Sequence, residues 1–237
     1  MSTVITQVWN EAPLLAMWLD WHGRMFDRVI VIDCASDDGS RELAEDKGAE
    51  IVDGPTVFAA AEIDALVMQV EQGVSGLRIA LNATEFLLTH PKHCASHWFI
   101  PSVSLVQMPD DEPFTWLGWF HTQRTHGVHW RDDFMLRRSR LMSRQGVTYP
   151  LGRHFMEVTE GPLIAHVAHC YVDDWMVERR LQIQTRIPAE DKARDLGFQH
   201  HDHGRGLTRD KVLAEQEAYR HRAVDCSADI AAGLSWC

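Results

Sequence analysis

The feature that most constrains this chain is a regular alternation of short apolar runs and helix-like segments over its first 90 residues. Residues 29–32 read Val-Ile-Val-Ile, a continuous β-branched run typical of a strand buried on both faces. Other apolar runs predict strands at 4–9, 49–52 and 77–81, and apolar residues at helical spacing predict helices at 13–22, 41–47 and 57–72. Strands separated by such helices predict an α/β fold with a parallel sheet and right-handed crossovers.

Polar clusters follow three of these predicted strands. They are Asn10 with Glu11, residues 33–40 and residues 82–85. The carboxyl ends of parallel strands share one edge of a sheet, and ligands bind at that edge in open α/β folds. The sequence therefore predicts a ligand site there.

The second half of the chain has a different pattern, with many tryptophan and histidine residues. Strands are expected at 99–106, 134–138 and 163–170. Helices are expected at 175–187 and 208–221, and Thr208 can cap the second of them. The polar segment 188–206 is expected to form a mobile connection.

Charge and cysteine content exclude several classes of function. The 34 acidic residues outnumber the 23 Lys and Arg and give a net charge of −11, whereas general nucleic-acid binding needs a basic surface. A phosphorylated small molecule can still bind, because helix N-termini and a few arginines suffice. The five scattered cysteines contain no Cys-x-x-Cys pair, so neither a disulfide framework nor a zinc ribbon is expected.

The sequence also bears on location. No apolar run of about 18 residues predicts a transmembrane helix, and residues 1–6 do not resemble a signal peptide. We therefore expect a cytoplasmic protein. Peripheral membrane association and homo-oligomerisation are left open.

Several motifs occur in the order found in family 2 glycosyltransferases and the related group that carries a D-x-D-E-F motif. They are Asn10-Glu11, the W-x-x-x-H of Trp18 to His22, the D-x-x-S-x-D-G-S-like loop at 33–40, the segment 81–87 in place of D-x-D-E-F-L, a G-x-H-like element at 152–154, and a strand-end histidine element at 165–169. The chain resembles a family 2-like glycosyltransferase well over residues 4–88 and loosely over 150–185.

This resemblance implies a GT-A fold, with a Rossmann-like, mostly parallel sheet flanked by helices in a single domain over residues 1–237. Residues 1–90 would bind the nucleotide sugar, residues 91–187 would bind the acceptor, and residues 188–237 would form a helical extension. Asp38 is expected to bond to its own loop and to cap the second helix. The implied donor-side residues are Asn10, Glu11, Asp33, Asn82, Thr84, Arg153 and His154.

The metal site that the resemblance implies is altered in this chain. The two D-x-D aspartates that would hold Mn²⁺ or Mg²⁺ are replaced by Asn82 and Thr84, and neutral oxygens bind a hard divalent cation only weakly. The remaining candidate metal ligands are Glu85 and His169. Three alternatives stay open: a metal-independent enzyme that neutralises its leaving group with Arg or His, a metal site built on Glu85 and His169, or a degenerate copy that binds a donor without turnover.

An inverting transferase needs a carboxylate base near the acceptor hydroxyl. Asp110, Asp111 and Glu112 follow a predicted strand and precede the aromatic segment 114–116, which is suited to stacking on a sugar. These three are the candidate catalytic residues, and a solvated acidic turn is the alternative interpretation. A retaining mechanism would not need this base, so the stereochemistry is left open.

The predicted function is transfer of a sugar from a nucleotide-sugar donor to a hydroxyl group of a glycan or other acceptor. The alternative is a non-catalytic donor-binding or partner module of a glycan-assembly complex. A metal-dependent hydrolase that uses some of the 14 histidines is a weaker alternative, since no H-E-x-x-H motif occurs. The clear basic patch could grip a diphosphate or line a solvated strand edge, and it consists of Arg137, Arg138, Arg140 and Arg144.

Overall fold

The computed structural model describes residues 1–94, 97–129, 139–146, 148–149, 153, 163–169, 174–196, 202 and 205–235. The strands are β1 (Ser2–Val8), β2 (Arg28–Asp33), β3 (Glu50–Asp53), β4 (Leu77–Ala80), β5 (Glu85–Leu87), β6 (His97–Val106), β7 (His126–His129), β8 (Ser139–Ser143), β9 (Ile164–His169) and β10 (Val224–Asp225). The helices are α1 (Ala12–His22), α2 (Ser40–Asp46), α3 (Ala60–Gly73), the short 3-10 helix η1 (Pro91–His93), α4 (Phe120–Gln123), α5 (Asp174–Arg186), α6 (Ala189–Ala193), α7 (Arg209–Arg220) and α8 (Ser227–Gly233).

The strands of the described residues form one sheet in the order β10-β7-β6-β8-β4-β1-β2-β3, and β9 pairs with both β5 and β6. Strands β1 to β4 are parallel to one another, whereas β8 is antiparallel to both β4 and β6. Strands β4 and β6 therefore run in the same direction, and their carboxyl ends point the same way as those of β1 and β2. The predicted α/β class and the parallel, helix-flanked sheet are confirmed, while the second half adds antiparallel pairs.

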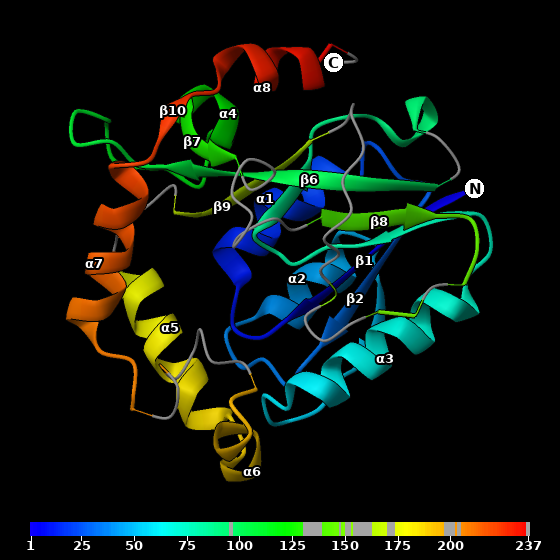
Figure 1. The fold of residues 1–237 in the computed structure, drawn as a ribbon. Coiled ribbons are helices and arrows are strands. Elements are labelled where there is room, and N and C mark those ends of the chain that lie inside the picture. The colour runs from blue at the N-terminus through cyan, green and yellow to red at the C-terminus, as the bar shows by residue number, and fades with distance from the viewer. Residues whose placement is uncertain are drawn as a thin grey trace.

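Helices cover both faces of the parallel strands, as Figure 1 shows. On one face, Ile5 and Ile32 pack with Ile63 and Val67 of α3. On the other face, Val4 and neighbouring strand residues pack with the apolar side of α1. This alternation follows from the strand geometry, because successive side chains point to opposite faces of a sheet. It explains why the run at residues 29–32 contains no polar side chain.

Helix α1 is also bound to β5 by polar contacts at its buried face. The indole nitrogens of Trp18 and Trp21 donate to the carbonyl oxygens of Glu85 and Leu87, each at 2.9 Å. The Leu87 amide donates to His22 Nε2 at 3.2 Å, and His22 Nδ1 lies 3.1 Å from the Trp18 carbonyl. The W-x-x-x-H motif thus fixes the strand that follows the loop at residues 82–84.

Helices α5 and α7 confirm the two helices predicted in the last third of the chain, and the Thr208 hydroxyl caps α7 by accepting from the Lys211 amide. The segment 188–206 was expected to be a connection, but its first residues form the short helix α6. Residues 134–138, for which a strand is predicted, lie outside the described residues. No helix in the described part of the chain is long and apolar enough to cross a membrane.

Candidate functional site

The loops after β1 and β2 bind each other through the polar residues that the sequence singles out. Asn10 adopts a left-handed backbone conformation, with φ of 52°. Its side chain donates to the Asp37 carboxylate at 2.7 Å and accepts from the Asp37 amide at 2.9 Å. The Glu11 amide donates to the Ser40 hydroxyl at 3.0 Å. Asn10 therefore holds the two loops together at the carboxyl edge of the sheet.

The two aspartates of the second loop have different roles. Asp33, at the end of β2, is buried and accepts from the Ser36 amide at 3.2 Å. Asp38 accepts from the Ser40 amide and hydroxyl within its own loop, as predicted. Its second oxygen accepts from the Ala12 amide at 2.9 Å, so Asp38 also satisfies the amino end of α1, which the sequence did not predict.

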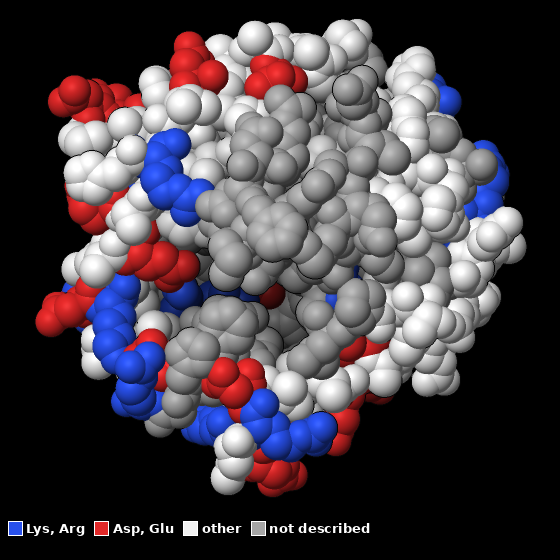
Figure 2. Space-filling model, viewed as in Figure 1, with Lys and Arg blue, Asp and Glu red and all other residues white. Residues whose placement is uncertain are grey.

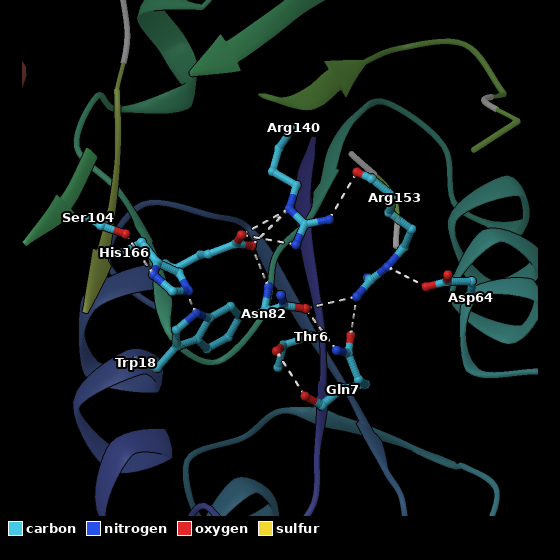
Figure 3. A network of polar contacts seen from close by, with 10 residues as sticks. Thr6, Gln7, Trp18, Asp64, Asn82, Ser104, Arg140, Arg153 and His166 are labelled. Carbon is cyan, nitrogen blue, oxygen red and sulfur yellow. Dashed lines mark hydrogen bonds and ion pairs between the residues drawn. The ribbon is translucent and has the colours of Figure 1, made fainter. Parts of the chain in front are cut away.

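The loop after β4 meets an arginine from the far half of the chain. The Asn82 side-chain oxygen accepts from Gln7 Nε2 at 2.8 Å and from Arg153 Nη2 at 2.9 Å. Arg153 Nη2 also donates to Gln7 Oε1 at 2.7 Å, and Arg153 Nε donates to Asp64 at 3.0 Å. Figure 3 shows the guanidinium of Arg153 surrounded by Gln7, Asn82 and Asp64. Arg153 thus lies against the ends of β1 and β4.

Glu85 does not have the surroundings of a metal ligand. Its buried carboxylate accepts from Arg140 Nε and Nη2, both at 2.9 Å, and from the Asn82 amide at 2.8 Å. Burial favours the neutral acid, but the Arg140 guanidinium, His166 and the Asn82 amide together outweigh it and hold the pKa of Glu85 below its usual value. Arg140 therefore pairs with the carboxylate that was expected to bind a metal, and its burial places it in the interior and not on a solvated strand edge.

Thr84, the second residue in place of the D-x-D aspartates, is half-buried, and its carbonyl oxygen accepts from the Val167 amide at 2.8 Å. Among the described residues, no group of three or more His, Cys, Asp or Glu side chains is arranged to hold a metal ion. The side chain of His169 lies outside the described residues, as do His154, Arg137 and Arg138. The described donor set at the D-x-D position therefore does not fit a divalent cation.

Two arginines of α5 complete this edge of the sheet, and the sequence did not single them out as binding residues. Arg179 Nη2 lies 2.5 Å from the Glu11 carboxylate. Arg186 donates to the carbonyl oxygens of Cys34 and Thr56, at 2.8 and 2.6 Å, and its guanidinium covers the ring of Trp9 at 4.1 Å. Arg179 lies within the helix predicted at residues 175–187, but its partner Glu11 could not be identified from the sequence.

Burial controls the ionisation of these groups. It raises the pKa of Glu11, and the neighbouring Arg179 opposes that rise. Burial lowers the pKa values of Arg153 and Arg186. It also raises the pKa of the Cys34 thiol to about 12. The edge therefore places arginines and carboxylates in poorly hydrated surroundings, where electrostatic interactions are strong.

The acidic turn at residues 110–112 follows β6. Asp111 accepts from the Met108 amide at 2.7 Å, and its carboxylate lies 3.6 Å from Nε of the buried Arg124. Asp110 and Glu112 are exposed. Within the described residues this turn contacts Met108 and Arg124, and no hydrogen bond there joins it to Asn10, Glu11 or Asp33. Asp111 shapes the turn, and the other two carboxylates face solvent.

The histidines of the described residues do not form the cluster that a hydrolase would need. His129 Nε2 lies 3.0 Å from Asp229 and 3.5 Å from Cys226 Sγ, at the contact between β7 and α8. His121 packs against the ring of Trp21. Residues 200, 201 and 203 lie outside the described part of the chain.

Comparison with curated proteins gives a partial match. No family model matches the chain. The glycosyltransferase AglJ of Haloferax volcanii is 46% identical over 50 residues, which is 21% of this chain and 16% of that protein. The matched segment therefore represents about a sixth of the curated relative.

Comparison with solved structures gives weak likenesses. Glucosyl-3-phosphoglycerate synthase from Mycobacterium tuberculosis, in complex with Mn²⁺, UDP and glucosyl-3-phosphoglycerate, is 17% identical over 44% of each chain, with a TM-score of 0.35. Mannosyl-3-phosphoglycerate synthase from Rubrobacter xylanophilus is 16% identical, over 48% of this chain and 43% of that chain, with a TM-score of 0.35. At these TM-scores the fold described above rests on the strands and helices of this chain alone.

Proposed function

We propose that this protein transfers a sugar from a nucleotide-sugar donor to a hydroxyl group of a glycan or other acceptor. The observation that carries the proposal is the convergence of Asn10, Glu11, Asp33, Asn82 and Arg153 at the carboxyl edge of β1, β2 and β4. Ligands of open α/β sheets bind at such an edge. The partial identity with a protein named as a glycosyltransferase supports the same function.

In the proposed reaction an acceptor hydroxyl replaces the nucleoside diphosphate at the sugar carbon. The bond from that carbon to the diphosphate oxygen breaks, and the electron pair stays on the departing diphosphate. Buried Asp33 and Glu11 would accept hydrogen bonds from the nucleoside, while Arg153 would face the phosphates. Asp110 or Glu112 would take the hydroxyl proton in an inverting reaction, and Asp111 would hold the turn that carries them.

We further propose that this reaction proceeds without a divalent cation. Asn82 and Thr84 offer neutral oxygens, and both oxygens of the Glu85 carboxylate already accept hydrogen bonds from Arg140. An arginine can stabilise charge on a leaving phosphate through paired N–H donors.

The decisive experiment is a calorimetric and thermal-shift screen against UDP, GDP, CMP and their common sugars, each with Mn²⁺ and with EDTA. Stabilisation by one nucleotide in EDTA supports metal-free donor binding, and stabilisation only with Mn²⁺ contradicts it. No response to any nucleotide would overturn the transferase proposal. A screen of acceptors for nucleotide release then follows, with Asp110→Asn expected to lower turnover while donor binding is retained.

The neutral residues at positions 82 and 84 also favour a second candidate, a module that binds a donor or a partner without catalysis. The double variant N82D/T84D separates the two candidates. If it gains metal binding and turnover, the present chain is a degenerate copy. If it loses an existing activity, the metal-free enzyme is supported.

A further inference from the structure

Three arginines at the carboxyl edge each have a buried guanidinium nitrogen without a hydrogen-bond partner in the described part of the chain. These atoms are Arg153 Nη1, Arg179 Nε and Arg186 Nη1. A buried donor left without a partner is costly, and such donors are rare in folded proteins. An arginine nitrogen can donate but cannot accept, so the group that would satisfy each atom is an acceptor.

The three side chains converge on one region. Arg153 contacts Gln7 and Asn82, and Arg179 pairs with Glu11. Arg153 and Arg186 both lie close enough to the Cys34 thiol for their charges to shift its pKa. The carboxylates of Asp33 and Glu11 also act on this thiol. All of these groups therefore lie around the end of β2. Figure 2 shows that this face of the molecule is hollowed beside α5, with basic and acidic side chains visible inside.

Arg153 is held in a costly conformation. It is 3% exposed, and its φ of 55° lies in the left-handed region, which non-glycine residues rarely adopt. Its carbonyl oxygen accepts from Arg140 Nη1 at 2.9 Å, so the Glu85–Arg140 pair stabilises this backbone (Figure 3). Backbone strain of this kind persists where the surrounding structure imposes it, and it is frequent at ligand sites.

The three arginines differ in whether a carboxylate pairs with them directly. Arg153 pairs with Asp64, and Arg179 pairs with Glu11. Arg186 donates to two carbonyl oxygens, and no carboxylate among the described residues forms an ion pair with it. Asp33 and Asp37 act on the charge of Arg186 only through space, so an anion with several acceptor oxygens would satisfy the three unpartnered nitrogens and give Arg186 a direct partner.

We propose that Arg153, Arg179 and Arg186 form an anion site that binds the diphosphate of a nucleotide, in the role that a divalent cation would otherwise have. This inference rests on the proposed function, because it assigns the donor's diphosphate to that site. It also accounts for the contacts of α5, whose two arginines lie against the edge at which the nucleoside would bind.

The test is calorimetry in EDTA, with UDP, GDP, CDP, inorganic pyrophosphate and the phosphate-free nucleosides as probes. Arg153→Gln and Arg186→Gln are compared with Arg205→Gln, whose arginine is 70% exposed and pairs with Asp202. Each site variant is expected to weaken diphosphate binding by about tenfold to a hundredfold, the range for one hydrogen bond to a charged group. The site variants are expected to bind the phosphate-free nucleosides with the affinity of the wild type. Arg205→Gln is expected to bind the diphosphates with the affinity of the wild type. Pyrophosphate should compete with the nucleotide in the wild-type protein.

Two outcomes would overturn the anion site while the donor site stands. One is nucleoside diphosphate binding that is equal in the wild type, Arg153→Gln and Arg186→Gln. The other is the absence of pyrophosphate competition in the wild type, a measurement that does not depend on the folding of any variant. Thermal unfolding checks that each variant is folded, and Arg153→Lys, which keeps the charge but loses the planar fork, should show an intermediate affinity. If no nucleotide binds the wild type, the proposed function itself fails.

Discussion

The Glu85 carboxylate receives two hydrogen bonds of 2.9 Å from the Arg140 guanidinium, and both side chains are buried. The pair joins β5 to β8 at the position where the resemblance implies a metal ligand. Because Arg140 also donates to the Arg153 carbonyl, the pair helps to fix the backbone from which the Arg153 side chain extends. A positive side chain thus occupies the surroundings in which a cation was expected.

Breaking this pair is predicted to be strongly destabilising. Glu85→Gln leaves the buried Arg140 charge uncompensated, which typically costs about 3–5 kcal/mol of unfolding free energy. Glu50→Gln is the matched control, because Glu50 pairs with Arg28 on the surface and exposed pairs contribute about 0–1 kcal/mol. Urea denaturation measures both. Similar losses in the two variants would contradict the structural role of the buried pair.

The buried imidazole of His22 predicts a loss of stability in acid. Burial lowers its pKa from 6.5 to about 3, so the folded state holds it neutral. The unfolded chain therefore binds more protons between pH 6.5 and 3, and stability falls through that window as pH falls, by up to about 1.4 kcal/mol per unit. Above pH 6.5 this contribution is complete.

His22→Gln should remove this part of the pH dependence and lower stability at pH 7, because the Leu87 amide and Trp18 carbonyl lose well-placed partners. His221→Gln, at an exposed position on the surface, is the control. Chemical denaturation at several pH values tests the prediction. If the stability of His22→Gln depends on pH as that of the wild type does, His22 does not cause the loss of stability in acid.

Asn10 is predicted to stabilise the fold through its backbone conformation as well as through its side-chain hydrogen bonds. Asn10→Ala loses two hydrogen bonds to Asp37 and places a Cβ-bearing residue without a local polar partner in the left-handed region, at a cost of about 1–3 kcal/mol. Asn10→Gly loses the same bonds but adopts this conformation readily. Thermal unfolding should therefore rank Asn10→Gly above Asn10→Ala, and the reverse order would contradict the backbone argument.

The thiols of Cys34 and Cys94 are predicted to be unreactive in the folded protein. Burial raises the pKa of each to about 12, and only the thiolate is a good nucleophile. Iodoacetamide at pH 8 should leave both unmodified in native protein and alkylate both in urea, as peptide mass spectrometry would show. Rapid native alkylation of Cys34 would mean that the edge of the sheet around it opens.

The local elements could be predicted from the sequence because each has its own periodicity. The run at residues 29–32 forms a strand with buried side chains on both faces, and Pro13 lies in the first turn of α1. The loop role of Asp38 was also predicted, since short polar side chains bond to nearby backbone amides. Its bond to Ala12 was not, because that contact depends on how β1 and β2 pair.

The polar contacts between distant segments could not be predicted. Glu85 and Arg140 lie 55 positions apart, and nothing in local periodicity selects one arginine from four in the basic patch. The resemblance favoured Glu85 as a metal ligand because it stands next to the altered D-x-D positions. Only the antiparallel pairing of β8 with β4 and β6 brings Arg140 to it.

The separation of partners along the chain has a consequence for synthesis. Arg153 and Gln7 are 146 positions apart, and Arg186 and Cys34 are 152 apart. On the ribosome, strands β1 to β4 emerge long before these arginines and Arg179, so Asp64 remains without Arg153 and Glu11 without Arg179 while the amino-terminal strands assemble. A nascent chain halted before residue 153 would present an acidic rim that repels phosphate. Its affinity for anions would then appear only after Arg153, Arg179 and Arg186 have been translated.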